Sequence, residues 1–182
     1  DFLLQILNGY FFNQRMQIET MIIRKAKLKD VPDIVKMWKE FMEEHDKIVT
    51  SSESKLREQL KRKKEAEKLF KDYIAKNIRS KNSILFIAEV NGEPIGYNMS
   101  HIKPDIPIFE IDKLGLVSDM FVKKRHRGSK ISSMFKENAF NWFKKKGVKY
   151  ASIILHAPNS YAHSVYKNWG FIDHKIEMRK KL

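Results

Sequence analysis

A basic turn ahead of a helix-like stretch is the first feature of the chain that could do chemistry. Lys123, Lys124, Arg125 and Arg127 precede residues 130–145, whose apolar side chains recur at helical spacing. The N-terminus of a helix exposes backbone N–H groups and the positive end of the helix dipole, and fixed cations strengthen that field. The turn therefore predicts a binding site for a pyrophosphate group.

A second motif, N-x-x-A-x-x-x-Y-x-x-x-G-F, runs from Asn159 to Phe171. With both motifs in place, the chain resembles the GNAT superfamily of acyl-CoA-dependent N-acetyltransferases. The turn at residues 127–132 lies where that family has its Arg/Gln-x-x-Gly-x-Gly/Ala pyrophosphate loop, and the expected order of elements agrees from Met21 to Leu182. The resemblance implies direct transfer of an acetyl group from acetyl-CoA to a primary amine in a ternary complex, with no metal.

The resemblance also implies roles for individual residues. Backbone groups of Met120, Phe121 and Val122 would hold the acetyl carbonyl and the pantetheine arm of the cofactor. Asn159 would reach the same arm, and Tyr166 would stand near the sulfur as the general acid. The pyrophosphate would lie on a loop made of Arg127, Gly128, Ser129, Lys130, Ile131 and Ser132.

Two positions of that loop depart from the family pattern. Lys130 and Ser132 stand where the family usually has glycines. Glycine lets backbone amides close on a phosphate because it has no Cβ in the way. Serine is small enough to be tolerated there, and we expect Lys130 to point outward and add a cation to the phosphate site.

The chemistry of the reaction justifies these roles independently. Attack of an amine on a thioester needs a neutral amine, a stabilised oxyanion and a proton for the leaving thiolate. A strand amide meets the second need, and the phenol of Tyr166 meets the third. For the base we expect Asp119, acting directly or through water, with Glu110, His101 and His156 as further candidates. Glu110 and His156 are also expected to contact the amine substrate.

The elements that must position these residues follow from the apolar pattern. Asn91-Gly92 between two apolar runs is a strong hairpin signal, and Asp30 with Pro32 marks the start of a helix. The expected strands are residues 21–26, 84–90, 94–102, 111–122, 150–155 and 171–179. The expected helices are one after Asp30, one over 53–80 interrupted at 61–64, and those over 130–145 and 159–169.

This order, β-α-α-β-β-β-α-β-α-β, contains one strand–helix–strand crossover after a meander. A crossover joins parallel strands, so the sequence predicts an α/β (α+β) fold. Its sheet should be mixed and mostly antiparallel, with helices on both faces, as in the GNAT family. With 182 residues the chain is long enough for one domain, expected over 21–182. Residues 1–20 are expected to be an extension, helical or not part of the natural protein.

The composition excludes several classes of protein. The chain has no cysteine, which excludes disulfide frameworks, thiolate metal sites and cysteine nucleophiles. An apolar run long enough to span a membrane and a cationic leader are both missing from the sequence, so no membrane partner is expected and the expected location is cytoplasmic.

The net charge of +14 implies attraction to an anion. Residues 123–149 hold ten basic residues against one acidic, whereas residues 82–122 hold two against six. The reversal predicts an anionic cofactor on one side and a cationic acceptor on the other: a polyamine, a lysine or the N-terminus of a basic peptide. An alternative is a catalytically weak binding module of the same fold, recognising nucleic acid or a protein. Nucleic acid is the less favoured partner, and a homodimer is left open.

Overall fold

The computed structural model describes residues 20–52 and 54–181 of the 182-residue chain. The predicted extension over residues 1–20 lies outside this part of the chain, except for Thr20. The backbone N–H of Thr20 donates to Asn91 Oδ1 at 3.2 Å, which places the start of the domain beside the predicted hairpin turn.

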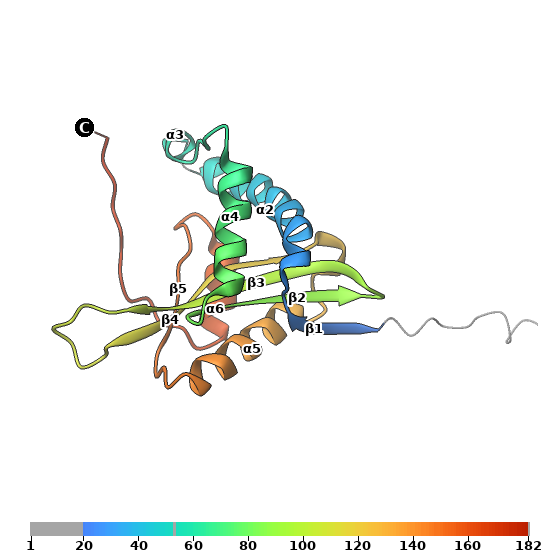
Figure 1. Ribbon diagram of the computed structural model, residues 1–182. Coiled ribbons are helices and arrows are strands. Elements are labelled where there is room, and N and C mark those ends of the chain that lie inside the picture. Colours follow the sequence, from blue (N-terminus) through green and yellow to red (C-terminus); the bar gives the residue numbers. More distant parts are fainter. Residues whose placement is uncertain (1–19, 53, 182) are drawn as a thin grey trace, which may run out of the picture.

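One mixed sheet forms the centre of the domain (Figure 1). Its strands lie in sequence order, and β1 to β4 are antiparallel neighbours, while β4 and β5 run parallel. The strands are β1 (Met21–Lys25), β2 (Ser83–Val90), β3 (Glu93–Pro104), β4 (Lys113–Val122) and β5 (Ala151–Ile153). The predicted hairpin and the predicted crossover are both confirmed, because the chain must pass over the sheet to bring β5 parallel to β4.

Helices cover both faces of the sheet, as predicted (Figure 1). Helices α2 and α4 pack on one face against Leu85, Tyr97 and Phe121, and α5 packs on the other against Ile84 and Val122. The α-helices are α2 (Val31–Ser52), α3 (Leu56–Gln59), α4 (Ala66–Arg79), α5 (Ile131–Lys145) and α6 (Ser160–Asn168), with short 3₁₀ turns η1 (Leu28–Asp30) and η2 (Lys124–His126). None of the helices in the described ranges is long and apolar enough to cross a membrane.

Two of the expected elements differ from the structure. The second helix divides into α3 and α4, because residues 60–65 leave the helical path around the predicted interruption. The last predicted strand is wrong: residues 171–181 contain no strand. Ile172, Ile176 and Met178 are 79%, 92% and 90% exposed there. Alternating apolar residues give a segment the pattern of a strand, but a strand forms only where a neighbouring edge pairs with it.

A cluster of charges fixes the beginning of α2. The guanidinium of Arg24 on β1 donates to both carboxylate oxygens of Asp30, at 2.7 and 2.8 Å, and also to Glu89 on β2. The backbone N–H of Lys27 donates to Asp30 at 2.6 Å. Because Asp30 immediately precedes α2, this cluster locks the first turn of the helix to the edge of the sheet.

Candidate functional site

The site begins where β4 and β5 separate. Their pairing ends at Val117↔Ile153, and the pairing of β4 with β3 shifts at the same point because Ser118 is an extra residue in β4. The Ser118 hydroxyl donates to the backbone oxygen of Met99 at 3.0 Å, which fixes this bulge. Residues 119–122 then pair with β3 alone among the described strands. One edge of β4 is therefore open beside β5.

Two predicted cofactor residues present backbone groups to this open edge. The N–H of Lys123 donates to Ile95 O of β3 at 2.8 Å. Backbone groups of successive residues in a strand point to opposite sides, so those of Val122 and Met120 point toward the gap. Phe121 lies between them, directs its backbone groups to β3 and buries its ring in the core under α2. Met120 and Val122 therefore offer the free amides that could bind an extended ligand.

The predicted pyrophosphate loop forms a cradle of free amides at the N-terminus of α5. Gly128 and Lys130 have positive φ, at 84° and 62°, so the backbone curls before the helix begins. Within the described part of the chain, the backbone N–H groups of residues 128–133 donate to no acceptor. These amides and the positive end of the α5 dipole converge on one exposed spot, and that arrangement suits a phosphate group.

Lys130 occupies the left-handed region that the family pattern reserves for glycine. Its φ of 62° and ψ of 9° bring its Cβ close to its own backbone, at a cost of about 1–2 kcal/mol for a residue other than glycine. The residue is exposed, so its ammonium has room to approach a bound anion. Ser132 lies in the first turn of α5, half-buried. The loop therefore keeps the geometry of the glycine motif with a strained lysine in it.

Arg127 is held by three groups of the protein. Its Nε donates to Val122 O at 2.8 Å, one Nη donates to Glu44 on α2, and the guanidinium lies 5.7 Å from the centre of the Phe121 ring. The resemblance implies a pyrophosphate contact for this residue. In the structure it also ties the loop to α2, the helix on the other side of β4.

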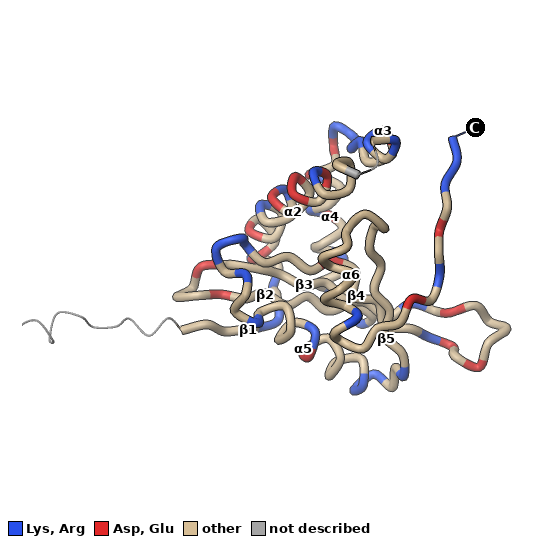
Figure 2. The backbone as a smooth tube through the Cα atoms, turned by 180° about the vertical axis from the view of Figure 1, so that it is seen from behind, with Lys and Arg blue, Asp and Glu red and all other residues tan. Residues whose placement is uncertain are grey.

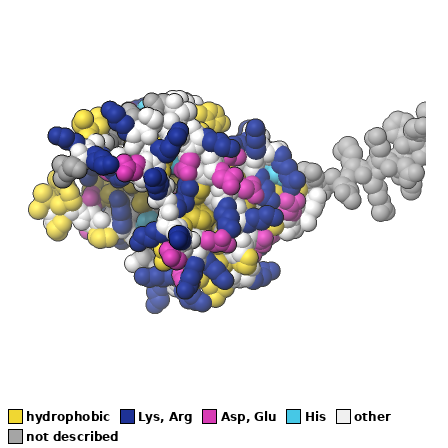
Figure 3. Space-filling view, turned by 90° about the horizontal axis from the view of Figure 1, so that it is seen from above, with side chains coloured by type: hydrophobic (Ala, Val, Ile, Leu, Met, Phe, Trp, Pro, Cys, Tyr) yellow, Lys and Arg dark blue, Asp and Glu magenta, His cyan; other side chains and the backbone are white. Residues whose placement is uncertain are grey.

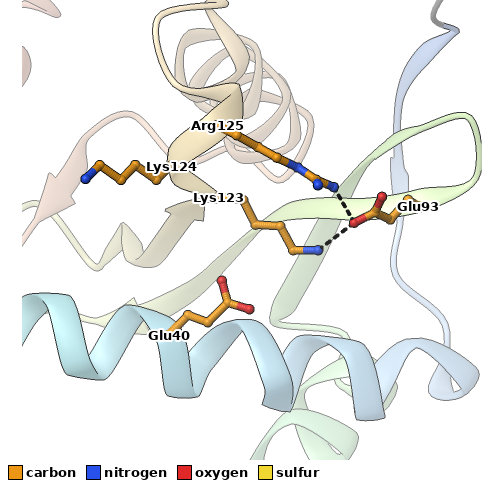
Figure 4. A pocket seen from close by; sticks show the side chains of 5 residues that line it. All are labelled: Glu40, Glu93, Lys123, Lys124 and Arg125. Atoms are coloured by element: carbon orange, nitrogen blue, oxygen red, sulfur yellow. Dashed lines mark hydrogen bonds and ion pairs between the residues drawn. The ribbon is translucent and has the colours of Figure 1, made fainter.

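Other basic residues of the turn line a shallow pocket of about 310 Å³ (Figure 4). Lys123 and Arg125 both bind the carboxylate of Glu93, at 3.0 and 2.6 Å, and Glu40 of α2 faces them across the pocket. Lys124 points the other way (Figure 4) and makes no ion pair within the described residues. Three of the four cations that suggested an anion site are thus held in ion pairs inside the protein, Lys123 and Arg125 with Glu93 and Arg127 with Glu44.

Helix α6 carries the second motif. Asn159 Oδ1 accepts the backbone N–H of Ala162 at 3.1 Å, so this side chain caps the helix in addition to any contact with a cofactor. The ring of Tyr166 packs against Trp169 and Phe171, with centroids 5.5 and 6.3 Å away. Burial raises the pKa of the Tyr166 phenol above its ordinary value of 10, which keeps the proton on the hydroxyl at neutral pH.

The end of α6 is held against α5 by aromatic contacts. The Lys136 ammonium of α5 lies 5.5 Å from the Trp169 ring centre, and the Phe140 and Phe171 rings meet edge to face at 6.0 Å. Because α5 also carries the amide cradle at its N-terminus, one helix positions both sequence motifs.

Asp119 lies on the opposite side of β4 from α5. It shares a face with Phe121, two residues along, and this face packs under α2 and α4. Desolvation by burial raises the Asp119 pKa to about 6. The nearby Tyr97 ring is fully buried, and its hydroxyl has no hydrogen-bond partner among the residues that the structure describes. Burial and the Asp119 charge both raise the Tyr97 pKa.

The two histidines predicted as base candidates lie at different places. His101 is on β3, opposite Leu116, and burial lowers its pKa. His156 follows β5, and its ring meets the His45 ring of α2 at 4.8 Å. His45 was missed as a site residue because its partner is far away in the sequence. Its position four residues after Phe41 on the apolar face of a helix was the only local signal.

The acidic residues of the β3–β4 loop and of α2 lie in two separate regions. Glu110 lies with Asp105 and Asp112 in the β3–β4 loop, which projects beyond the sheet away from α2 (Figures 1 and 2). On α2, Glu44 binds Arg127 and Asp46 binds Arg62 at 2.7 Å. Figure 3 shows acidic and basic side chains intermixed on the face seen from above. Among the described residues, no cluster of three or more His, Asp or Glu side chains could hold a metal ion.

The sequence matches the model of the acetyltransferase (GNAT) family over residues 37–171. No match was found among curated proteins.

Solved structures share the fold at low sequence identity. The BH1408 protein of Bacillus halodurans, solved as a tetramutant, has a TM-score of 0.73 and 21% identity, over 88% of this chain and 99% of that chain. A predicted acetyltransferase of Clostridium acetobutylicum, solved with acetyl-CoA, gives 0.71 and 18%, over 89% and 96%. The aminoglycoside 6′-N-acetyltransferase AAC(6')-IG of Acinetobacter haemolyticus gives 0.66 and 15%, over 88% and 99%.

Proposed function

Because the chain belongs to the acetyltransferase (GNAT) family, we propose that it transfers an acetyl group from acetyl-CoA directly to a cationic primary amine in a ternary complex. The observation that carries this proposal is the open edge of β4 beside the amide cradle of α5. An extended pantetheine arm would pair with Met120 and Val122 as a strand does, and its pyrophosphate would accept hydrogen bonds from residues 128–133.

The reaction needs a neutral amine, a stabilised oxyanion and a proton for the leaving thiolate. A neutral amine attacks the thioester carbonyl carbon, the C–N bond forms and the C–S bond breaks. A backbone N–H of the β4 edge would stabilise the oxyanion, as fixed amide dipoles do in acyl transfer. The protonated phenol of Tyr166 would supply the proton to the leaving thiolate. Asp119 would provide negative charge on the face opposite α5.

Ion pairs within the protein reduce the number of acidic residues that could attract a cationic acceptor. Glu44 and Asp46 are already paired with arginines, and the β3–β4 loop acids project away from α2. The acids left to attract an ammonium are Asp119 and, on α2, Glu40 and Glu43, which form no ion pair in the described part of the chain. A solved neighbour that is, by its name, an aminoglycoside acetyltransferase adds support, since aminoglycosides are polycationic amines.

A panel of amines at low and high salt tests the proposal. Release of the CoA thiol is measured with spermidine, a lysine peptide, a neutral amino acid and an anionic amine as acceptors. We expect spermidine or the basic peptide to react fastest and added salt to weaken their apparent affinity, because salt screens exposed charges. If a neutral or anionic amine reacts faster, the assignment of a cationic acceptor is wrong, and only the proposal of acetyl transfer to an amine remains.

Calorimetry with acetyl-CoA separates the enzyme from the alternative binding module. Saturable binding together with turnover supports the enzyme. Absence of saturable binding below millimolar concentration would favour the module, in which Lys130 and Ser132 have replaced the loop glycines at the expense of the cofactor site.

A further inference from the structure

Two imidazole rings meet beside the open edge of β4. His45 comes from α2 and His156 from the segment between β5 and α6, and their ring centres are 4.8 Å apart at an angle of 66°. No hydrogen bond joins the two rings. The two histidines come from segments that are distant in the chain. Packing alone does not explain why their rings are in contact.

The strand register places this pair at the mouth of the gap. The last pair of the parallel strands β4 and β5 is Val117↔Ile153, and His156 follows three residues after it, where the two strands have separated. A series of ring contacts leads to the same place from the other side. The Phe41 ring is 5.9 Å from Phe121 on β4 and 5.8 Å from His45.

The His45 imidazole is poised to accept a proton. Its Nδ1 is buried and has no hydrogen-bond partner among the described residues. The nearest carboxylate, that of Asp46, lies 3.7 Å away and is bound at both oxygens by Arg62, at 2.7 and 2.8 Å. Burial lowers the His45 pKa, the neighbouring His156 and Arg62 lower it further, and Asp46 opposes them. His45 is therefore neutral at pH 7, and one of its two ring nitrogens carries a lone pair that can accept a proton.

We propose that His45, with His156 beside it, accepts the proton that the acceptor ammonium must lose before it attacks the thioester. This inference rests on the proposed function. It adds a residue to the reaction and names His45 of α2 as the base in preference to Asp119, which lies on the face of β4 that α2 covers.

The proton balance of the reaction is complete with this pair. The ammonium R–NH₃⁺ gives one proton to His45, and the neutral amine attacks the carbonyl carbon. The attacking nitrogen releases its second proton to water as the C–S bond breaks, while the thiolate takes one proton from Tyr166, which regains a proton from water. The products are the amide, the CoA thiol and one proton, which leaves the imidazolium for water. His156 is less buried than a core residue and offers the exit toward solvent.

The activity test compares His45→Gln with the parent chain, using spermidine as the acceptor across pH 6 to 10. We expect kcat/KM at pH 7 to fall about 100-fold, the lower end of what general base catalysis contributes. The loss should shrink as the pH approaches the pKa of the amine itself, because the amine then needs no base. A structural defect would give a loss that is the same at every pH. That result would overturn the proposal.

Two matched variants accompany this test. His174→Gln replaces an exposed histidine of the C-terminal segment and should leave kcat/KM unchanged at every pH. Asp119→Asn decides between the two candidate bases. If Asp119→Asn lowers kcat/KM at pH 7 and the decrease disappears at high pH, and His45→Gln shows no such pattern, the base is Asp119 and the proposal fails.

A titration of the histidine side chains by NMR is independent of activity. We expect His45 to titrate below its ordinary value of 6.5, and His156→Gln to raise the His45 pKa because it removes a neighbouring positive charge. If the pKa of His45 is unchanged in His156→Gln, the two histidines do not act as a pair and the proposal fails. If the parent acetylates no amine of the panel, the proposed function and the proton role both fall, while coupled titration would still establish the pair itself.

Discussion

Helix α2 connects two polar clusters that have opposite character. Before its first turn, Arg24, Asp30 and Glu89 satisfy one another, and each buried carboxylate accepts a hydrogen bond from the guanidinium. Toward its other end, the buried His45 Nδ1 and Tyr97 Oη have no partner among the described residues. Asp119 on the same face has a pKa raised by burial, whereas Arg24 lowers the pKa of Asp30.

The difference separates a structural cluster from the one that we propose to be functional. Buried polar groups are normally hydrogen-bonded, and a group left unpaired costs about 1–3 kcal/mol. A protein retains such a cost where a ligand or a transferred proton completes the missing interactions. The first cluster should therefore govern stability with little effect on the reaction, and the second should govern the reaction at the expense of stability.

Removal of the structural carboxylate should have the largest effect on stability. Asp30→Ala leaves Arg24 half-paired, and we expect the free energy of unfolding to fall by about 3 kcal/mol. Urea denaturation measures the loss. The contribution of Asp30 is present above its unfolded pKa of 3.8 and disappears as the pH falls through the lowered folded value, so the difference between the variants should vanish in acid. Asp33→Ala, an exposed acid of the same helix turn, is the control.

Tyr166→Phe should slow the reaction without destabilising the fold. We expect kcat to fall about 10- to 100-fold, because a positioned general acid contributes about 10²–10⁴-fold and water replaces part of it. The dissociation constant of acetyl-CoA, measured by calorimetry, should stay nearly the same. Tyr161→Phe, on the exposed side of α6, should change neither quantity. Equal turnover in Tyr166→Phe and the parent would remove this phenol from the mechanism.

Asp119→Asn should stabilise the protein while altering its function. Because the folded pKa of about 6 lies above the unfolded value of 3.8, stability falls as the pH rises from 3.8 to about 6, and the full cost of the charged carboxylate is present above 6. The asparagine removes this cost, so we expect a gain of about 1–2 kcal/mol at pH 8 and none at pH 4. Denaturation at the two pH values measures it. A loss of stability at pH 8 would place Asp119 with the structural cluster.

Lys130→Gly should give the smallest change and separate strain from charge in the cradle. Glycine adopts a φ of 62° without strain but gains entropy in the unfolded chain, so we expect a net stabilisation of about 0.5 kcal/mol. Loss of the ammonium should weaken acetyl-CoA binding severalfold and flatten its dependence on salt. Lys130→Ala keeps the strain and should show the same weakening. Tighter binding by the glycine variant would show that the lysine obstructs the cofactor.

The sequence predicted those parts of the fold that are encoded locally. The Asn91-Gly92 turn set the hairpin, and the period of apolar residues set α5 and the sides of the sheet that the helices cover. The strand expected over residues 171–179 was wrong, because pairing depends on a distant edge and the alternation of Ile172 and Ile176 says nothing of one.

The candidate site also has parts that are encoded locally and parts that depend on contacts between distant segments. The amide cradle at residues 128–133 lies within one continuous motif, so its location could be predicted from the sequence, and its role in cofactor binding stays a prediction. The meeting of His45 with His156 joins segments that are distant in the chain and could not be inferred from either local pattern. The capture of Arg127 by Glu44 is another long-range contact of this kind.

That contact gives the two substrates a means of thermodynamic linkage. Arg127 reaches from the proposed pyrophosphate loop to Glu44 on α2, the helix that we propose borders the acceptor. A phosphate that draws the guanidinium away would leave Glu44 free beside Glu40 and Glu43, and a cationic acceptor that then pairs with Glu44 would keep the guanidinium on the phosphate. Such coupling is reciprocal, so each substrate tightens the other by the same factor. Positive cooperativity between donor and acceptor would then favour the fully loaded enzyme over either binary complex, which the apparent affinity for acetyl-CoA at saturating amine would reveal.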